Sequence, residues 1–403
     1  MKRIPLSISE NYIAALSERL GFDLSPKNLL TKAGKAYILK KAAFVSQISE
    51  GLTLNREKFL QTDYLKDPEI SEAYLLYFMT TNLLKIIQPL QELELSGIFD
   101  TPKINVLDFG TGTGAAMWGL IEYLRLTTNT PELSLTLTDS LDENLHSAEK
   151  FGESFIPKYF SGTTSKPKLG FSKYDVTNPT VIPRLVKDNA PYHLITGMNV
   201  LNELDEAADA LLLESFNQLL DSDGAMVFIE PANRDQSRRL LRFRDTALLQ
   251  GHKVFSPCTM QLSCPALVST DDWCHHNTAW ERPAFIKAID DATGLLRLSL
   301  KYSYLIIRKD GKTMQDVLGT TGLMRTVSER FDEKGRTRAI LCGETGRAEY
   351  VVNKRDKSPV NGDFFRTERY DLLSVGDVEA REHDRRITDL SPISIMLPKL
   401  GAR

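Results

Sequence analysis

The spacing of apolar residues along the chain changes near residue 100. Upstream of it, apolar positions recur every three or four residues in YIAALSERL, in LLTKAGKAYILKKAAFVSQI and in EAYLLYFMTTNLLKIIQPLQEL. This is the period of a helix that buries one face. The third run ends near Gly97, within the breaker-rich SGIFDTPK. We therefore expect residues 1–100 to form an N-terminal helical region.

From residue 104 short apolar runs alternate with longer amphipathic stretches. The strand-like runs are INVLDFG, LSLTLTD, KYDV, YHLITGMNVL and GAMVFIEP, and helical spacing appears between them, as in AAMWGLIEYLRLT and AADALLLESFNQLL. Strands that alternate with helices predict a parallel sheet with crossover helices. Residues 101–250 are therefore expected to form a doubly wound, Rossmann-like α/β domain that ends with the basic helix NRDQSRRLLRFRDTALLQ.

The remaining residues, 251–403, are expected to be rich in β-structure. The runs RLSLKYSYLIIRK, RAILCGE and RAEYVVNK are strand-like and are bounded by glycine and charged turns. The fold class that follows is α/β, with N-terminal helices, a doubly wound sheet and a β-rich C-terminal region.

Composition is that of an ordinary globular chain, with 42% hydrophobic and 26% charged residues among 403. No apolar run reaches the roughly 18 residues of a membrane span, and MKRIPLSISENYIAAL lacks the apolar core of a signal peptide. We expect no membrane association and a cytoplasmic location, with the mitochondrial matrix as the alternative. The sequence does not determine the oligomeric state, although a monomer is expected.

Charge is distributed unevenly along the chain. Residues 297–403 carry 21 Lys and Arg against 16 Asp and Glu, whereas residues 1–296 carry 29 against 37. A basic C-terminal region is suited to a polyanion such as RNA. Solvated side chains on a small domain explain the same count equally well.

The stretch VLDFGTGTGAAMWG is a strand that runs into a glycine-rich turn and then a helix. Such turns let the backbone approach a ligand closely. An acid two residues before the first glycine would repel a diphosphate, but it would hold the ammonium group of a methionine. The pattern D-x-G-x-G-x-G resembles the first motif of class I S-adenosylmethionine-dependent methyltransferases. The cofactor-binding residues expected on this basis are Asp108, Gly110, Gly112, Gly114, Asp139, Asp175 and Asn199.

Catalytic residues are not determined by the sequence. The fourth strand leads into GMNVLNEL, where Asn199, Asn202 and Glu203 are placed to face a methyl donor. The Pro-Pro-aromatic clamp of amino-methylating enzymes is absent from this motif. Asn199 and Glu203 are therefore the weak catalytic candidates, and Glu230 in VFIEP is expected to be a binding or structural group.

All four cysteines lie after residue 250. Cys258, Cys264 and Cys274 have the spacing C-x5-C-x9-C, and Cys342 follows after 67 intervening residues. Four thiolates bind either tetrahedral zinc or a cubane iron–sulfur cluster. His275 and His276 are alternative ligands, and buried thiols that serve only as small apolar groups are a further interpretation.

Five motifs in order give a resemblance that covers most of the chain. VLDFGTGTG, VFIEP, the block SPC…SCP…DWCHH…W, YSYLIIRK and RAILCGETGRAEYVVNK are similar to those of methyltransferase-like assembly factors of the small ribosomal subunit, found in mitochondria and with bacterial relatives. AYLLYFMTTN replaces an Arg-Leu-Pro-Ala-type stretch of that family.

The resemblance implies a class I methyltransferase fold, association with small-subunit ribosomal RNA and the assembling subunit, and a 4Fe-4S cluster. Its ligands would be Cys258, Cys264, Cys274 and Cys342, which leaves His275 and His276 near the cluster or facing RNA. Nearby arginines are expected to offer a stripe for phosphates, or else to be an ordinary solvated helix face; they are Arg234, Arg238, Arg239, Arg242 and Arg244.

Three functions follow from these features. The first is an assembly factor that binds ribosomal RNA, S-adenosylmethionine and a 4Fe-4S cluster. The second is an active ribosomal RNA methyltransferase, so the sequence leaves enzymatic activity open. The third is a zinc-bound interaction protein with a vestigial methyltransferase fold.

Overall fold

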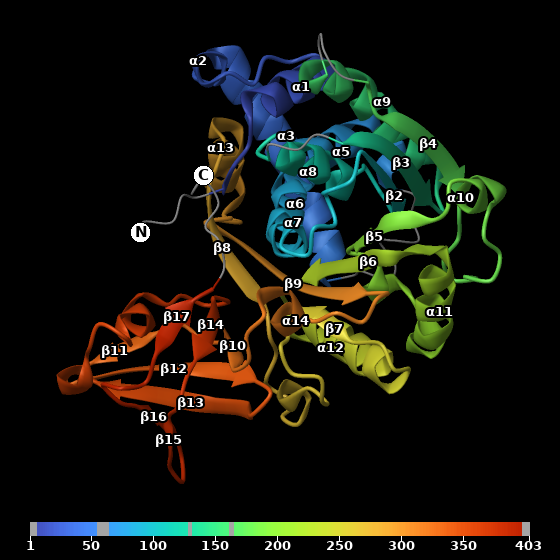
Figure 1. Ribbon diagram of the computed structural model, residues 1–403. Helices are drawn as coiled ribbons and strands as arrows, with labels where there is room; N and C mark the ends of the chain where they lie inside the picture. Colours follow the sequence, from blue (N-terminus) through green and yellow to red (C-terminus); the bar gives the residue numbers. More distant parts are fainter. Residues whose placement is uncertain (1–5, 55–63, 128–130, 161–164, 397–403) are drawn as a thin grey trace.

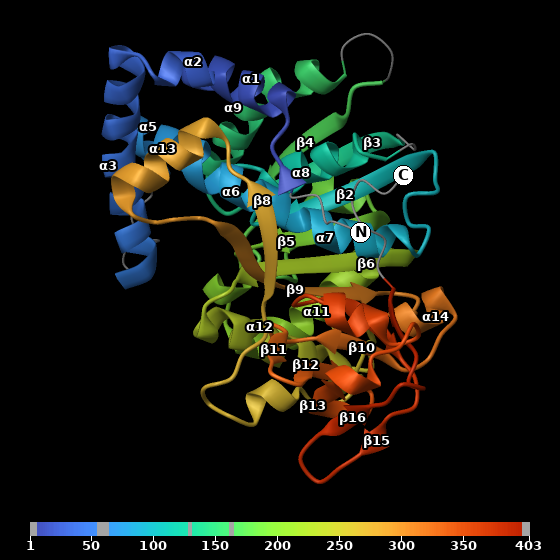
Figure 2. The same cartoon turned by 90° about the vertical axis from the view of Figure 1, so that its left-hand side faces the viewer.

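The computed structural model describes residues 6–54, 64–127, 131–160 and 165–396. Within these residues the chain forms a nine-stranded and an eight-stranded β-sheet. Both cartoon views place the second sheet at the opposite end of the molecule from helices α1 (Glu10–Leu20) and α2 (Pro26–Leu29) (Figures 1 and 2). No described helix is both long enough and apolar enough to cross a bilayer.

The expected N-terminal helical region is present. After α1 and α2 it contains α3 (Lys32–Leu54), η1 (Tyr64–Lys66), α5 (Pro68–Ala73), α6 (Thr80–Leu83), η3 (Leu84–Ile86) and α7 (Ile87–Glu94). The third predicted helix is not one regular α-helix, because Tyr74–Met79 forms the π-helical segment η2 between α5 and α6. Short π-helical segments inside helices occur frequently at functional sites.

The first sheet contains the predicted parallel strands. In spatial order its main path is β1 (Leu6–Ser7), β8 (His276–Glu281), β9 (Ser299–Arg308), β6 (Leu220–Pro231), β5 (Tyr192–Met198), β2 (Lys103–Phe109), β3 (Glu132–Asp139) and β4 (Lys168–Lys173), and β7 (Val254–Ser256) pairs with β9. Strands β2 to β6 pair in parallel, and β9 is antiparallel to β6. The run KYDV, expected as a strand, lies mostly beyond β4, which ends at Lys173.

Both faces of this sheet are buried, which explains its nearly continuous apolar runs. Successive residues of β6 enter different cores: Val227 packs with the N-terminal helices, and Phe228 packs on the other side. Helices α8 (Ala115–Leu124) and α9 (Asp142–Tyr159) share the first core, whereas α10 (Arg184–Asp188), α11 (Asp209–Leu219) and α12 (Arg234–Leu249) share the second. The predicted doubly wound α/β arrangement is therefore confirmed.

The second sheet forms the predicted β-rich C-terminal region. Its strands are β10 (Leu323–Thr326), β11 (Phe331–Glu333), β12 (Arg336–Gly343), β13 (Gly346–Asn353), β14 (Leu372–Val375), β15 (Glu379–Ala380), β16 (Arg385–Ile387) and β17 (Ile393–Ile395). Helices α13 (Ala284–Thr293) and α14 (Met314–Leu318) precede it. The division into residues 1–100, 101–250 and 251–403 stays a prediction, and β7, β8 and β9 of the third range lie in the first sheet.

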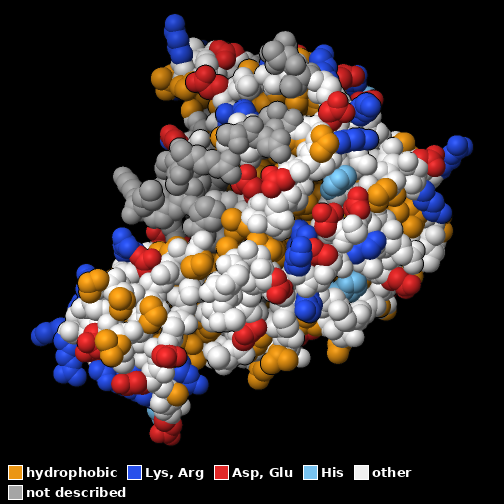
Figure 3. Space-filling view, viewed as in Figure 1, with side chains coloured by type: hydrophobic (Ala, Val, Ile, Leu, Met, Phe, Trp, Pro, Cys, Tyr) orange, Lys and Arg blue, Asp and Glu red, His pale blue; other side chains and the backbone are white. Residues whose placement is uncertain are grey.

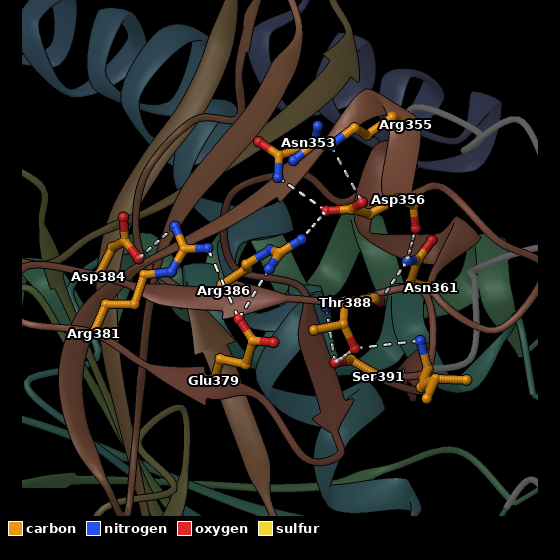
Figure 4. A network of polar contacts seen from close by, with 11 residues as sticks. Asn353, Arg355, Asp356, Asn361, Glu379, Arg381, Asp384, Arg386, Thr388 and Ser391 are labelled. Atoms are coloured by element: carbon orange, nitrogen blue, oxygen red, sulfur yellow. Dashed lines mark hydrogen bonds and ion pairs between the residues drawn. The ribbon is translucent and has the colours of Figure 1, made fainter.

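Many basic side chains of the C-terminal region are held in ion pairs. Arg386 contacts Asp356 at 2.8 Å and Glu379 at 3.1 Å (Figure 4). In the same network, the Asn361 side-chain amide donates hydrogen bonds to the carbonyl oxygens of Asp356 and Thr388. Figure 3 shows Lys and Arg side chains gathered over this end of the molecule with Asp and Glu between them. Some of the basic side chains of this region are therefore engaged by acidic neighbours.

Candidate functional site

A cavity of about 740 Å³ opens at the carboxyl ends of the parallel strands. It lies where the strand order reverses, between β2 and β5, which is the usual ligand crevice of a doubly wound sheet. The volume is typical of small-molecule sites. Six of the seven predicted cofactor-binding residues line it, and they are Asp108, Gly110, Gly112, Asp139, Asp175 and Asn199.

The glycine-rich turn forms the floor between β2 and α8. Gly110 and Gly112 line the cavity with φ angles of +59° and +52°, in the left-handed region that favours glycine. A Cβ on Gly110 would lie 2.5 Å from Val200 Cγ2, whereas one on Gly112 would meet no atom within 4 Å. Gly114 does not line the cavity: it caps α8 with φ +85°, and a Cβ there would meet the Trp118 ring.

Asp108 is buried at the end of β2, with 1% of its surface exposed. Its two carboxylate oxygens accept hydrogen bonds from the Thr111 and Thr196 hydroxyls, each at 2.6 Å. Burial raises the pKa of Asp108 to about 7, although both hydroxyls act in the opposite direction. A cationic ligand group would restore the ionised form, because an opposite charge nearby lowers the pKa of a carboxyl.

Asp139 and Asp175 follow the next two strands. Asp139 accepts the Gly112 and Leu141 N–H groups at 2.9 and 3.0 Å and the Asn144 amide at 2.9 Å. Burial raises its pKa, against these hydrogen bonds. Asp175 accepts from the backbone and hydroxyl of Thr177. Both carboxylates are thus oriented by the turns that present them to the cavity.

Asn199 follows β5 in a strained conformation, with φ +61°. Its side-chain Oδ1 is buried and has no hydrogen-bond partner in the described part of the chain. Buried polar atoms are nearly always paired, so this oxygen is an acceptor that a ligand in the cavity can satisfy. Glu203, in η4 (Leu201–Glu203), also lines the cavity.

Glu230 holds the loop that carries these two candidates. It is fully buried at the end of β6 and accepts the Leu201 N–H at 2.9 Å and the Asn202 side-chain amide. These bonds agree with the expected binding or structural role for Glu230.

Sequence reasoning missed another part of the cavity wall. It contains Tyr74, Phe78, Asn82, Lys85, Arg297 and Lys301. The first four have the spacing i, i+4, i+8 and i+11, which is the period of one helix face. That signal was present in AYLLYFMTTNLLK, but periodicity alone cannot separate a core face from a site.

The four cysteines, distant in sequence, border a second and smaller cavity. Cys258, Cys264 and Cys274 come from the segment after β7, and Cys342 comes from β12. No group of three or more His, Cys, Asp or Glu side chains among the described residues is arranged to hold a metal ion. The structure therefore brings the predicted ligands to one place without showing a metal site.

Burial raises the pKa of Cys264 to about 12, and the neighbouring Cys258 thiol acts in the same direction. Burial also raises the pKa of Cys274 and of Cys342. Arg244, Arg325 and Arg347 border the same cavity. Cationic neighbours are appropriate for a set of thiolates that carries net negative charge with either zinc or a cluster.

The arginines of α12 do not form the expected phosphate-facing stripe. Arg239 is buried and pairs with Asp209 at 2.5 Å, and Arg244 is 1% exposed. Arg244 donates to the Met260 and Leu262 carbonyls, and Arg238 donates to carbonyls at Ala266, Ser269 and Asp272. Only Arg234 and Arg242 of the set are exposed, and both contact acids. The prediction of a phosphate-facing stripe was wrong because Arg238 and Arg244 bind carbonyl oxygens of the cysteine segment, while Arg239 and Arg242 pair with Asp209 and Glu206.

His275 and His276 have different surroundings. His276 is buried against the rings of Tyr302, Tyr304 and Tyr370, with centroids 5.0 to 6.0 Å away. His275 is half-buried, and its Nδ1 lies 3.4 Å from a guanidinium nitrogen of Arg369. Burial, followed by the charge of Arg369, lowers the pKa of His275 to about 4, so the ring is neutral at pH 7. Neither histidine lines the cysteine cavity.

Comparison with known proteins gives a match to one family model. The matching model is described as "Rsm22: Mitochondrial small ribosomal subunit Rsm22" and covers residues 165–377. No curated protein matches the sequence.

Among solved structures, the chain is similar to a Listeria monocytogenes protein assigned as a class I S-adenosylmethionine-dependent methyltransferase. Identity is 12% over 76% of this chain and 91% of that one, with a TM-score of 0.37. It is also similar to magnesium protoporphyrin IX methyltransferase from Synechocystis PCC 6803 with bound S-adenosylmethionine, at 10% identity over 66% and 96% of the two chains and a TM-score of 0.33.

The sheet order, the glycine-rich turn after β2 and the antiparallel β9 beside β6 are those of the class I methyltransferase fold. The family match extends from just before β4 to just after β14, and so includes the cysteine segment and most of the second sheet. Because residues 165–377 make up more than half of the 403-residue chain, the protein belongs to the Rsm22 family.

Proposed function

We propose that this protein is an assembly factor of the small ribosomal subunit that binds small-subunit ribosomal RNA and S-adenosylmethionine. The observation that carries the proposal is the match of residues 165–377 to a family model whose description names the mitochondrial small ribosomal subunit. The same description favours the mitochondrial matrix over the cytoplasm. The acid-lined cavity of the first sheet supports the binding of a cationic cofactor.

The methyl donor, S-adenosylmethionine, would be held by residues at four strand ends. Asp108 would hold the methionine ammonium and Asp139 the ribose hydroxyls, while Asp175 would contact the adenine. Gly112 leaves room for the ligand against the backbone, whereas Gly110 leaves room for Val200; the unpaired Oδ1 of Asn199 would accept a hydrogen bond from the ligand. When bound, the cofactor supplies a methyl group on a positively charged sulfur.

The four cysteines would hold a 4Fe-4S cluster, with zinc as the alternative. The four thiols around one cavity are a suitable donor set for either. The group would tie the segment after β7 to β12, so its loss should first loosen the contact between the two sheets. An anaerobic preparation that is brown, with broad absorption near about 400 nm, supports the cluster. A colourless preparation with one bound zinc contradicts it.

The RNA-binding proposal is tested with purified protein and two transcripts of equal length. Small-subunit ribosomal RNA should bind more tightly than a large-subunit fragment, and its affinity should decrease steeply as salt increases. Equal affinity for both transcripts would contradict specific association with the small subunit.

An active ribosomal RNA methyltransferase is the second candidate. It is favoured by the strained Asn199 with its unpaired oxygen, because strain of this kind is concentrated at functional sites. Transfer of labelled methyl groups to small-subunit RNA, lost in Asp108→Ala, would establish turnover. Absence of transfer with intact binding of both ligands would favour the assembly role alone. A zinc-bound protein that binds neither RNA nor cofactor would favour the vestigial-fold alternative.

A further inference from the structure

Three cations border the large cavity on the wall that sequence reasoning missed. Lys85 belongs to η3, Arg297 precedes β9, and Lys301 lies in β9. Within the described residues none of the three forms a salt bridge: Lys85 Nζ donates to the neutral Asn82 side chain at 2.7 Å, and the Arg297 side chain interacts with the Tyr77 hydroxyl. Arg297 and Lys301 are exposed, whereas Lys85 is partly buried and is attracted by Glu230, a carboxylate that already accepts hydrogen bonds from Leu201 and Asn202. A partly buried cation that forms no salt bridge is a candidate ligand-binding group.

The sheet separates these cations from the acids. Asp108, Asp139 and Asp175 stand at or beyond the ends of β2, β3 and β4, on one side of β5. Lys301 stands on β9, on the other side of β5 and β6. A methyl donor with a sulfonium and an ammonium group is attracted to the acidic wall. The cationic wall is instead suited to an anionic group of a second ligand.

Two aromatic rings flank the cations. Tyr74 and Phe78, both in η2, line the cavity, and their rings stack with centroids 5.5 Å apart at 25°. Tyr74, Phe78, Asn82 and Lys85 line the same cavity, and the π-helical segment that contains the first two leads through α6 into η3, which contains Lys85. Aromatic rings beside cations are the combination that binds single-stranded nucleic acid, through base stacking and phosphate contacts.

We propose that the cavity contains, beside the donor site, a subsite for a phosphate of single-stranded RNA formed by Lys85, Arg297 and Lys301. Tyr74 offers an aromatic surface to the adjoining base. The inference rests on the proposed function, because it names where the RNA meets the cofactor. It places one nucleotide next to the methyl donor, as either methyl transfer or cofactor-dependent RNA binding requires.

The protonation of Lys85 is consistent with an anion site. Burial, followed by the positive charge of Arg297, lowers the pKa of Lys85 to about 7, and the buried Glu230 acts in the opposite direction. A phosphate beside Lys85 would favour its charged form.

The test measures binding of a 5′-phosphorylated uridine dinucleotide to the full-length protein in saturating S-adenosylhomocysteine. Lys85→Met keeps the apolar stem of the side chain, and Arg297→Gln and Lys301→Gln change exposed side chains. A melting curve of each variant checks that it folds. Each substitution should lower dinucleotide affinity by about tenfold, the size of one lost charge-assisted hydrogen bond. Lys27→Gln, at an exposed position on α2, is the matched control and should have no effect.

S-adenosylhomocysteine affinity is measured on the same variants, because its carboxylate is the other oxyanion that could meet these cations. Weaker S-adenosylhomocysteine binding with unchanged dinucleotide binding would overturn the phosphate subsite in favour of the donor carboxylate. Unchanged binding of both ligands would also overturn it. If the wild-type protein binds the dinucleotide and the variants do not, the phosphate subsite is supported, even when long ribosomal RNA does not bind. A failure of the subsite can therefore be distinguished from a failure of the proposed function.

Discussion

The most informative perturbation concerns the protonation of Asp108. Its carboxyl group is buried and has a pKa raised to about 7, chiefly by desolvation. If it holds the methionine ammonium of the donor, the ligand binds the ionised form and competes with a proton. Donor affinity should therefore decrease as the pH falls through 7.

The magnitude follows from that pKa. At pH 8 the carboxyl is ionised in about nine-tenths of the molecules, and at pH 6 in about one-tenth. The dissociation constant of S-adenosylhomocysteine should therefore rise about tenfold between pH 8 and pH 6, equivalent to about 1.4 kcal/mol.

The assay is isothermal titration calorimetry across this pH range with two ligands. 5′-Methylthioadenosine keeps the ribose and adenine but lacks the ammonium, so its affinity should not follow the Asp108 titration. Asp108→Asn should remove the pH step for S-adenosylhomocysteine, and a melting curve checks that the variant folds. Identical pH profiles for the two ligands, or a step that persists in Asp108→Asn, would refute the assignment.

Three further predictions test other parts of the molecule. Cys342→Ser should abolish the 400 nm absorption and lower iron content, whereas retained cluster content would remove β12 from the ligand set. Glu92→Gln should destabilise the protein by about 3–5 kcal/mol in urea unfolding, because Glu92 pairs with Arg325 at 3.1 Å in a fully buried site. Arg184→Gln, which removes an exposed ion pair, is the control, and equal unfolding midpoints for the two variants would contradict the argument. Gly110→Ala should lower the urea midpoint of unfolding more than Gly112→Ala, because only the first adds a clash, with Val200, to the shared backbone strain. Equal midpoints for the two variants would show that backbone strain alone matters.

The Glu92 prediction depends on a junction between three parts of the chain. Arg325 of β10 contacts Glu92 of α7 and donates to the carbonyl oxygen of Pro257, next to Cys258. Tyr304 of β9 donates to the same carboxylate at 2.9 Å. The N-terminal helices, the cysteine segment and the second sheet therefore share one buried charge pair.

The sequence predicted the elements well where local pattern decides them. Alternation of strands and helices predicted the doubly wound sheet, and six of the seven cofactor-binding residues predicted from the strand ends and the glycine-rich turn line the cavity. Gly114 does not line the cavity. It caps α8, and its lack of a side chain leaves space for the Trp118 ring.

Other features could not be predicted because they depend on which distant residues meet. A run of arginines in α12 has the same sequence pattern whether it faces solvent or the cysteine segment, and only folding showed that Arg238, Arg239 and Arg244 are engaged internally. In the same way, RLSLKYSYLIIRK is a strand in any reading, but its place in the first sheet follows from pairing with β6.

The sequence by itself determined the types of the elements, the glycine-rich turn and the chemistry available in four thiols and a series of strand-end acids. These features depend on local backbone preference and on the spacing of apolar residues, and both signals lie in residues that are close together in the sequence. Only the tertiary structure brought Cys342 to the other cysteines and placed Lys85, Arg297 and Lys301 around the same cavity as Asp108. Such contacts between distant residues depend on long-range packing, because the burial of both sheet faces selects one arrangement among the many that the local pattern allows.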